Sequence, residues 1–142
     1  MAISNKDLSK RWEAMRNPIV EMEDSHSDAR GSIIPLADED MKSAVLITSK
    51  KGTVRANHFH HTDWHYCYVL KGKIDYHWRK AGDKGKCERV TIGQGQLFFT
   101  PPLVEHAMHF LEDTDFLCLG RNPRDQATYE ADITRVEVFQ PK

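Results

Sequence analysis

The sequence predicts an all-β protein of jelly-roll or barrel type that begins with one short helix. From Ser43 onward, short runs of β-forming residues alternate with turn residues, and eight such runs follow one another along the chain. The connections between them contain glycines, as in Lys71-Gly72 and Gly93-Gln94-Gly95, which adopt the positive φ angles that tight hairpins need. A succession of antiparallel hairpins is therefore expected.

The N-terminal 42 residues are expected to form a helix and an extended arm. Residues 4–7 have the form of a capping box, and apolar residues in 8–15 then follow one helical stripe that ends before Pro18. The acidic, turn-rich segment after it is expected to be mostly loop, with one short strand at 32–36. No second domain is expected to begin here.

Residues 43–142 are expected to form the barrel, in one domain with the arm. The eight predicted strands cover residues 43–49, 54–60, 65–70, 73–79, 88–92, 96–100, 105–111 and 115–120. A final strand is expected within 132–139, and only the N-terminal stretch shows a helical pattern.

Composition excludes several classes of function. The chain has 142 residues and a formal net charge of −1, which is typical of one soluble domain without a general attraction to nucleic acid or anionic lipid. It contains neither a membrane span nor the apolar centre of a signal peptide, so a cytoplasmic protein is expected. Cys67, Cys87 and Cys118 lack C-x-x-C spacing and are expected to be reduced thiols.

Most of the eight histidines gather near the ends of predicted strands. His58 and His60 are two residues apart, so their side chains point to the same face of a strand. A hairpin would bring His65 beside this pair, and His106 would arrive from a separate strand. The arrangement predicts that these imidazoles bind one divalent transition metal ion, and imidazole ligands leave its identity open among Fe, Zn, Ni, Cu and Mn.

The competing interpretation is that these histidines line a pocket as hydrogen-bonded polar groups without metal. Four histidines at ligand spacing favour the metal site over that alternative. The others, His26, His61, His77 and His109, are expected to be solvated or to support the pocket. Cys67 shares the predicted face of His65, but a buried inert thiol is the commoner role for such a residue.

A first motif resembles that of the cupin family. Gly52 is followed at the family's spacing by His58-Phe59-His60, then by His65 where the family usually has Glu, and finally by Gly72. Two motifs in the correct order are far more specific than an isolated His-x-His.

The second cupin motif follows in the expected order. Gly95, Pro101 and His106 hold its spacing, while Leu103 and Phe110 stand where the family has Gly and Asn. The resemblance covers about residues 52–110 and implies a single cupin-type jelly-roll barrel.

The cupin resemblance also implies a ligand set and a partner. In metal-binding cupins the equivalents of His58, His60, His65 and His106 hold one divalent ion. With His in place of Glu, the charge of the ion is uncompensated, which favours an anionic ligand. The ion should be lost as the pH falls through about 6, where free imidazoles become protonated. Because cupin-like sheets often pair, a homodimer is expected.

A weaker resemblance is to cupins that epimerise or isomerise nucleotide-linked keto sugars, generally without metal. In them an Arg shortly precedes a His-x-His-like segment, and the matching stretches here are residues 28–31, which contain Arg30, and residues 55–58, which begin with Arg55. The resemblance implies that these arginines contact the anionic group of the substrate. A pocket His would remove the proton beside a carbonyl, and Tyr66, Tyr68 or Tyr76 would return it. The candidate catalytic residues are therefore Arg55, Tyr68 and Tyr76.

Three functions follow from these observations. The first is a metal-dependent enzyme that acts on a small polar, anionic metabolite by sugar-type isomerisation or epimerisation. The second is an iron-dependent dioxygenase, which oxygen consumption would distinguish from the first. The third is a non-catalytic cupin that binds a metabolite or a metal and leaves no open coordination position for a substrate.

Overall fold

Twelve strands and a short C-terminal helix are ordered along the chain in the computed structural model, which describes residue 10 and residues 13–141. The strands are β1 (Ile19–Val20), β2 (His26–Asp28), β3 (Gly31–Ile33), β4 (Ser43–Ser49), β5 (Val54–His60), β6 (His65–Lys71), β7 (Lys73–Lys80), β8 (Glu88–Gly93), β9 (Leu97–Thr100), β10 (Val104–Phe110), β11 (Thr114–Gly120) and β12 (Ile133–Arg135), and the helix is α2 (Gln126–Asp132).

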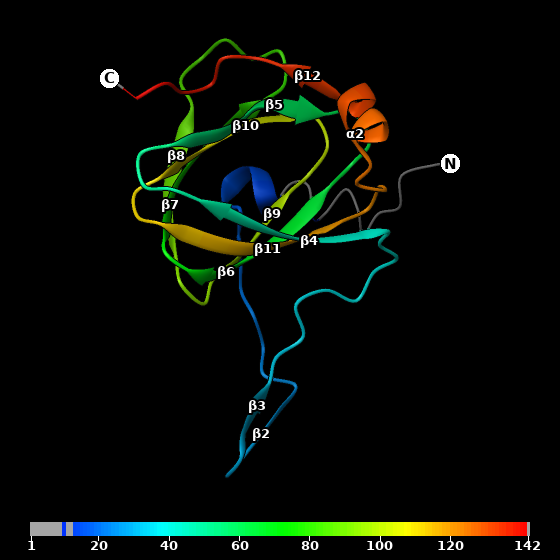
Figure 1. The fold of residues 1–142 in the computed structure, drawn as a ribbon, viewed down its shortest axis with the longest axis vertical. Helices are drawn as coiled ribbons and strands as arrows, with labels where there is room; N and C mark the ends of the chain where they lie inside the picture. Colours follow the sequence, from blue (N-terminus) through cyan, green and yellow to red (C-terminus); the bar gives the residue numbers. More distant parts are fainter. Residues whose placement is uncertain (1–9, 11–12, 142) are drawn as a thin grey trace.

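Ten of these strands form two five-stranded antiparallel sheets that face each other as the walls of a jelly-roll barrel (Figure 1), and β2 and β3 form a separate two-stranded sheet. The first sheet has the order β1-β9-β6-β11-β4, and the second has the order β12-β5-β10-β7-β8. All eight predicted barrel strands are present within one residue at either end. The predicted all-β jelly-roll class is therefore confirmed, while the expected strands at 32–36 and 132–139 are reduced to β3 and β12.

Helix α2 corrects the expectation that only the N-terminal stretch is helical. The Asp125 side chain caps it by accepting a hydrogen bond of 3.0 Å from the backbone N–H of Thr128. None of its residues is buried, so it has no apolar stripe that periodicity could detect. The helix leads directly into β12, which pairs with β5.

The N-terminal segment joins the barrel through a short stretch. The predicted capping box at 4–7, with Leu8 and Trp12, lies outside the described residues, but residues 13–16 are helical. The backbone carbonyl of Met15 accepts a hydrogen bond of 2.8 Å from the indole N–H of Trp78, and β1 then pairs with β9. Beyond β1, the β2–β3 hairpin projects away from the barrel (Figure 1). Within the described part of the chain, no helix has the length and apolarity needed to cross a bilayer.

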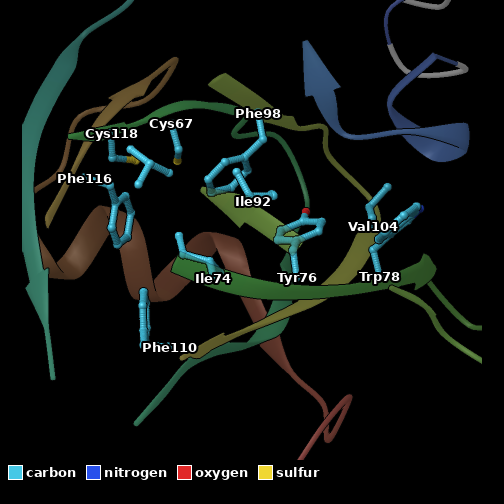
Figure 2. Packing of buried hydrophobic residues seen from close by; sticks show 11 residues of the cluster. Cys67, Ile74, Tyr76, Trp78, Ile92, Phe98, Val104, Phe110, Phe116 and Cys118 are labelled. Carbon is cyan, nitrogen blue, oxygen red and sulfur yellow. The ribbon is translucent and has the colours of Figure 1, made fainter. Parts of the chain in front are cut away.

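The barrel core lies between the two sheets (Figure 2). Along β6, Cys67 and Val69 point into it, whereas Tyr66 and Tyr68 point to the outer face, as the period of two in a strand requires. The inner cluster consists of Cys67, Val69, Ile74, Tyr76, Trp78, Ile92, Phe98, Val104, Phe110, Phe116 and Cys118. A separate outer cluster around Leu97 and Phe99 covers the other face of the first sheet. The polar histidines therefore share the interior with a closely packed apolar core.

Candidate metal site and its cavity

Three of the four predicted ligands come together on one wall of the barrel. His58 and His60 lie on β5, and His106 lies on β10 as the register partner of His58. The three side chains are buried, and one ring nitrogen from each lies within 4.8 Å of the others. We refer to His58, His60 and His106 as the three-histidine cluster.

A β-bulge places the cluster on β5. The register of β5 on β10 shifts beside His106, so that Asn57 is an extra residue on β5. Ala56 (φ 73°) and Asn57 (φ 53°) both adopt the left-handed conformation, which is rare for Ala. As a result Arg55 and His58 both line the same cavity, although they are three positions apart, an offset that puts side chains on opposite faces of a regular strand.

The C-terminal tail holds this bulge in place. The Asn57 side-chain oxygen accepts hydrogen bonds of 2.9 and 3.0 Å from the backbone N–H groups of Val138 and Phe139. The Asn57 amide group donates a further bond of 3.1 Å to the carbonyl of Phe139. Three hydrogen bonds thus stabilise the strained backbone next to His58.

The ring nitrogens of the cluster fit a cation. His58 Nδ1 and both nitrogens of His60 are buried without a hydrogen-bond partner, although buried polar groups are as a rule paired. His106 Nδ1 donates to the carbonyl of Val104 at 2.9 Å, which leaves Nε2 with its lone pair toward the cluster. Imidazole nitrogens with these properties are suitable ligands for a transition metal ion.

Burial keeps the three imidazoles neutral. It lowers the pKa of His106 to about 4 and, together with the nearby His106 and His65, the pKa of His58 to about 2. Burial and the neighbouring His65 also lower the pKa of His60 far below its ordinary value. Because a metal ion binds the neutral imidazole, no proton needs to be displaced from the cluster at neutral pH.

His65 lies on the opposite wall, on β6, and has a different environment. Its ring centroid is 4.7 Å from that of His60, but its Nε2 donates to Asp63 Oδ2 at 2.8 Å, and both side chains are buried. Burial disfavours the charged ring, but Cys118 and Asp63 outweigh it and raise the pKa of His65 to about 10. An imidazolium has no free lone pair. The structure therefore places His65 beside the three-histidine cluster as the cation of an ion pair.

A cavity of ≈ 640 Å³ opens between the two walls. Its polar lining includes His58, His65 and His106. Three arginines, Arg55, Arg124 and Arg135, also line it, and among the described residues no Asp or Glu does. The cavity is therefore electropositive and suits an anionic ligand.

Sequence reasoning did not identify Tyr129 on α2, Arg124 just before it or Arg135 on β12, although all three line the cavity. The Arg124 guanidinium lies 3.7 Å from the centre of the Tyr129 ring, and the Tyr129 hydroxyl is 3.5 Å from His58 Nε2. Arg124 Nε is buried and has no hydrogen-bond partner. The cap residue Asp125 was the available signal for the helix that carries Tyr129.

The two candidate arginines have different positions. Arg55 lines the cavity, and its side chain donates to Ser49 Oγ at 2.7 Å and to the carbonyl of Thr48 at 2.9 Å. Arg30 lies beside the turn of the β2–β3 hairpin, where its guanidinium pairs with Asp28 at 2.7 Å. Only Arg55 of this pair is next to the histidines.

The candidate tyrosines do not line the cavity. Tyr76 is buried behind Thr100, to whose hydroxyl its own is hydrogen bonded at 2.9 Å, and burial raises the pKa of Tyr76. Tyr68 and Tyr66 belong to the outer cluster on the other face of β6. The structure thus separates Tyr68 and Tyr76 from Arg55, although the Tyr76 ring lies 6.0 Å from that of His106.

The remaining histidines are outside the cluster. His26 is 3.1 Å from Asp28 on the exposed hairpin, and His61 is 2.7 Å from the hydroxyl of Thr134. His77 and His109 pack against Phe139, with ring centroids at 4.1 and 5.2 Å.

The Cupin domain family matches residues 45–119, which is more than half of the chain, so the protein belongs to the cupin family. No curated protein sequence matches it. The family membership confirms the resemblance that the two motifs indicated.

Solved structures of similar fold include sugar-modifying cupins. A double mutant of the 3,4-ketoisomerase QdtA from Thermoanaerobacterium thermosaccharolyticum, in complex with TDP, is 22% identical, with a TM-score of 0.65 over 82% of this chain and 85% of that one. The dTDP-4-dehydrorhamnose 3,5-epimerase from Sulfolobus tokodaii is 18% identical, with a TM-score of 0.59 over 78% and 79%. The RmlC epimerase from Mycobacterium tuberculosis is 14% identical, with a TM-score of 0.64 over 82% and 66%. At these identities the likeness shows the fold.

Proposed function

We propose that this chain is a metal-binding cupin enzyme that isomerises or epimerises a small anionic keto sugar. One observation carries the proposal: two of the three buried, neutral imidazoles, His58 and His106, line a cavity that is also lined by three arginines and, among the described residues, by no carboxylate. The names of the ketoisomerase and epimerases of similar fold support this class of reaction.

The three-histidine cluster would hold the ion. The hydrogen bond from His106 Nδ1 to Val104 fixes its tautomer, and the unpartnered nitrogens of His58 and His60 supply further ligands. A bound transition metal ion polarises a carbonyl oxygen and stabilises the negative charge that develops on it. His65, paired with Asp63, would contribute positive charge to the cavity rather than a fourth ligand.

The arginines would bind the acidic group of the substrate. Each is held by a neighbour: Arg55 by Ser49 and Thr48, Arg124 by the Tyr129 ring, and Arg135 by Glu130 at 2.8 Å. Guanidinium groups bind phosphate or carboxylate through paired, charge-assisted hydrogen bonds. Because these side chains are already positioned, binding costs less conformational entropy.

Tyr129 is the protic side chain that we assign to return a proton to the substrate carbon. Its hydroxyl lies 3.5 Å from His58 Nε2. Burial raises the pKa of Tyr129, so the hydroxyl keeps its proton at neutral pH and can donate it. Tyr76, whose hydroxyl is bonded to Thr100, would instead support the packing around His106.

The proposal is tested first by elemental analysis of protein purified without chelator. The protein is then incubated with a TDP-linked 4-keto-6-deoxy sugar in deuterated water, and NMR follows exchange of the proton beside the carbonyl. We expect one metal ion per chain and an exchange that His106→Ala abolishes and His26→Ala leaves unchanged.

Two other results would overturn the reaction class. Oxygen uptake by the iron-loaded protein, without proton exchange, would assign the iron-dependent dioxygenase. Metal-loaded protein that binds TDP but exchanges no substrate proton would assign a non-catalytic binding protein.

A further inference from the structure

Two cysteines face each other on the cavity wall opposite the three-histidine cluster. Cys67 on β6 and Cys118 on β11 are direct register partners in an antiparallel pair. Both are buried, at 3% and 5% exposed, and both line the cavity. Figure 2 shows the two side chains on the inner face of neighbouring strands. Both thiols are free.

The backbone spacing at this pair suits a disulfide. Residues directly opposite in antiparallel strands have Cα atoms about 4.5 or 5.5 Å apart. A disulfide accepts Cα separations of about 4.4–6.8 Å, so closure needs side-chain rotation rather than movement of the strands. Each strand is also held on its other side, β6 by β9 and β11 by β4, which keeps the two cysteines in register.

The two sulfur atoms also interact with each other. A hydrogen bond between the thiols raises the pKa of Cys67 and lowers that of Cys118. Cys87 differs from both, because its Sγ lies 3.9 Å from the carbonyl of Val138 and it does not line the cavity. The chain thus contains two cysteines that face each other in the cavity and a third, Cys87, that serves as a control thiol outside it.

We propose that Cys67 and Cys118 form a redox modification site, at which a peroxide that enters the cavity closes a reversible disulfide. The cavity volume of ≈ 640 Å³ admits a small oxidant to both sulfurs. This site does not depend on a metal in the three-histidine cluster or on the proposed sugar chemistry.

The chemistry balances with hydrogen peroxide as the oxidant. With Cys118 as the attacking group, its sulfur takes one peroxide oxygen, the O–O bond breaks, and one water leaves. The Cys67 sulfur then attacks the sulfenic acid, the S–O bond breaks, and a second water leaves as the S–S bond forms. The two thiols lose two electrons and two protons, and the peroxide is reduced to two waters.

The test uses the full chain with Cys87→Ala, so that the cavity pair supplies the only thiols. After treatment with hydrogen peroxide, we expect both thiols to disappear from a titration of unfolded protein. Intact mass should fall by two hydrogen atoms, and digestion should give one peptide linking Cys67 to Cys118. Dithiothreitol should restore both thiols, and circular dichroism should keep its β-rich form throughout.

The matched control adds Cys67→Ser to the Cys87→Ala chain. Its remaining Cys118 should stop at the sulfenic acid, which dimedone traps as a single adduct. The proposal is overturned if the cavity pair stays reduced under conditions that oxidise Cys87 in the unaltered chain. Oxygen addition to separate cysteines without the linked peptide would overturn it equally.

Discussion

The two walls of the cavity hold histidines in opposite electrostatic states. On the wall formed by β5 and β10, the three buried imidazoles stay neutral, and the Asp132 carboxylate, 3.6 Å from His60 Nδ1, is too far away for a hydrogen bond. On the wall formed by β6, His65 is equally buried but has Asp63 at 2.8 Å and becomes a cation. Burial acts in the same direction on both walls, so the carboxylate and Cys118 decide the difference. Spacing places a histidine, and its partners determine whether it can bind a metal.

The largest effect should come from removing a ligand on the neutral wall. His58→Ala and His106→Ala should each weaken retention of the metal by more than about 100-fold. Loss of a residue that only orients a metal ligand typically lowers metal affinity about 10- to 100-fold, and loss of the ligand itself should lower it further. Equilibrium dialysis followed by elemental analysis measures this, with circular dichroism to confirm the fold. His26→Ala, on the exposed hairpin, is the matched control. Full metal occupancy in the double variant His58→Ala, His106→Ala would refute the site.

On the wall formed by β6, Asp63→Ala should remove the ion pair between Asp63 and His65. This change leaves the His65 cation buried without its carboxylate and should lower the free energy of unfolding by about 3–5 kcal/mol. It also removes the acceptor for the backbone N–H of Asn122, at 2.9 Å. Urea denaturation measures the loss. Metal stoichiometry should stay at the unaltered value in the folded variant, whereas a parallel loss of metal would show that His65 acts with the cluster.

The contrast between the walls also shows how far the sequence could predict the molecule. Period-two runs and turn glycines predicted the barrel strands, and the His-x-His spacing with His106 predicted the neutral cluster. The state of His65 was not predictable, because it depends on how the loop before β6 orients Asp63. Tyr129 could not be associated with His58 either, since 71 residues separate them in sequence and only the folded barrel brings them together.

Acid should affect the two walls differently. The pKa of His106 is about 4 when folded against 6.5 in its ordinary state, so the unfolded chain takes up a proton that the folded chain refuses. The metal-free protein should therefore lose about 3 kcal/mol of stability from His106 alone as the pH falls from 6.5 to about 4. The His65 contribution is fully present below pH 6.5 and is lost only as the pH rises through about 10. Urea denaturation from about pH 4 to about pH 10 measures both changes in stability.

These pKa values also lower the pH at which the metal is expected to be released. Protons compete for His106 only near its folded pKa of about 4, so the ion should stay bound well below the pH of about 6 that free imidazoles suggest. The His106→Ala variant should show a flatter acid limb in metal-free denaturation. Complete metal loss already at pH 6 would contradict the neutral state that burial confers on this wall.

The smallest effect should come from Arg124, one of the three arginines that line the cavity. Arg124→Ala removes a guanidinium with an unpartnered buried Nε, and it should weaken the binding of TDP about tenfold, the value of one charge-assisted hydrogen bond in a partly solvated site. Arg30→Ala is the matched control, because that arginine is ion-paired on the hairpin and does not line the cavity. Isothermal titration calorimetry compares the two, and added salt should reduce the difference. Equal affinities would show that the ligand's anionic group lies elsewhere.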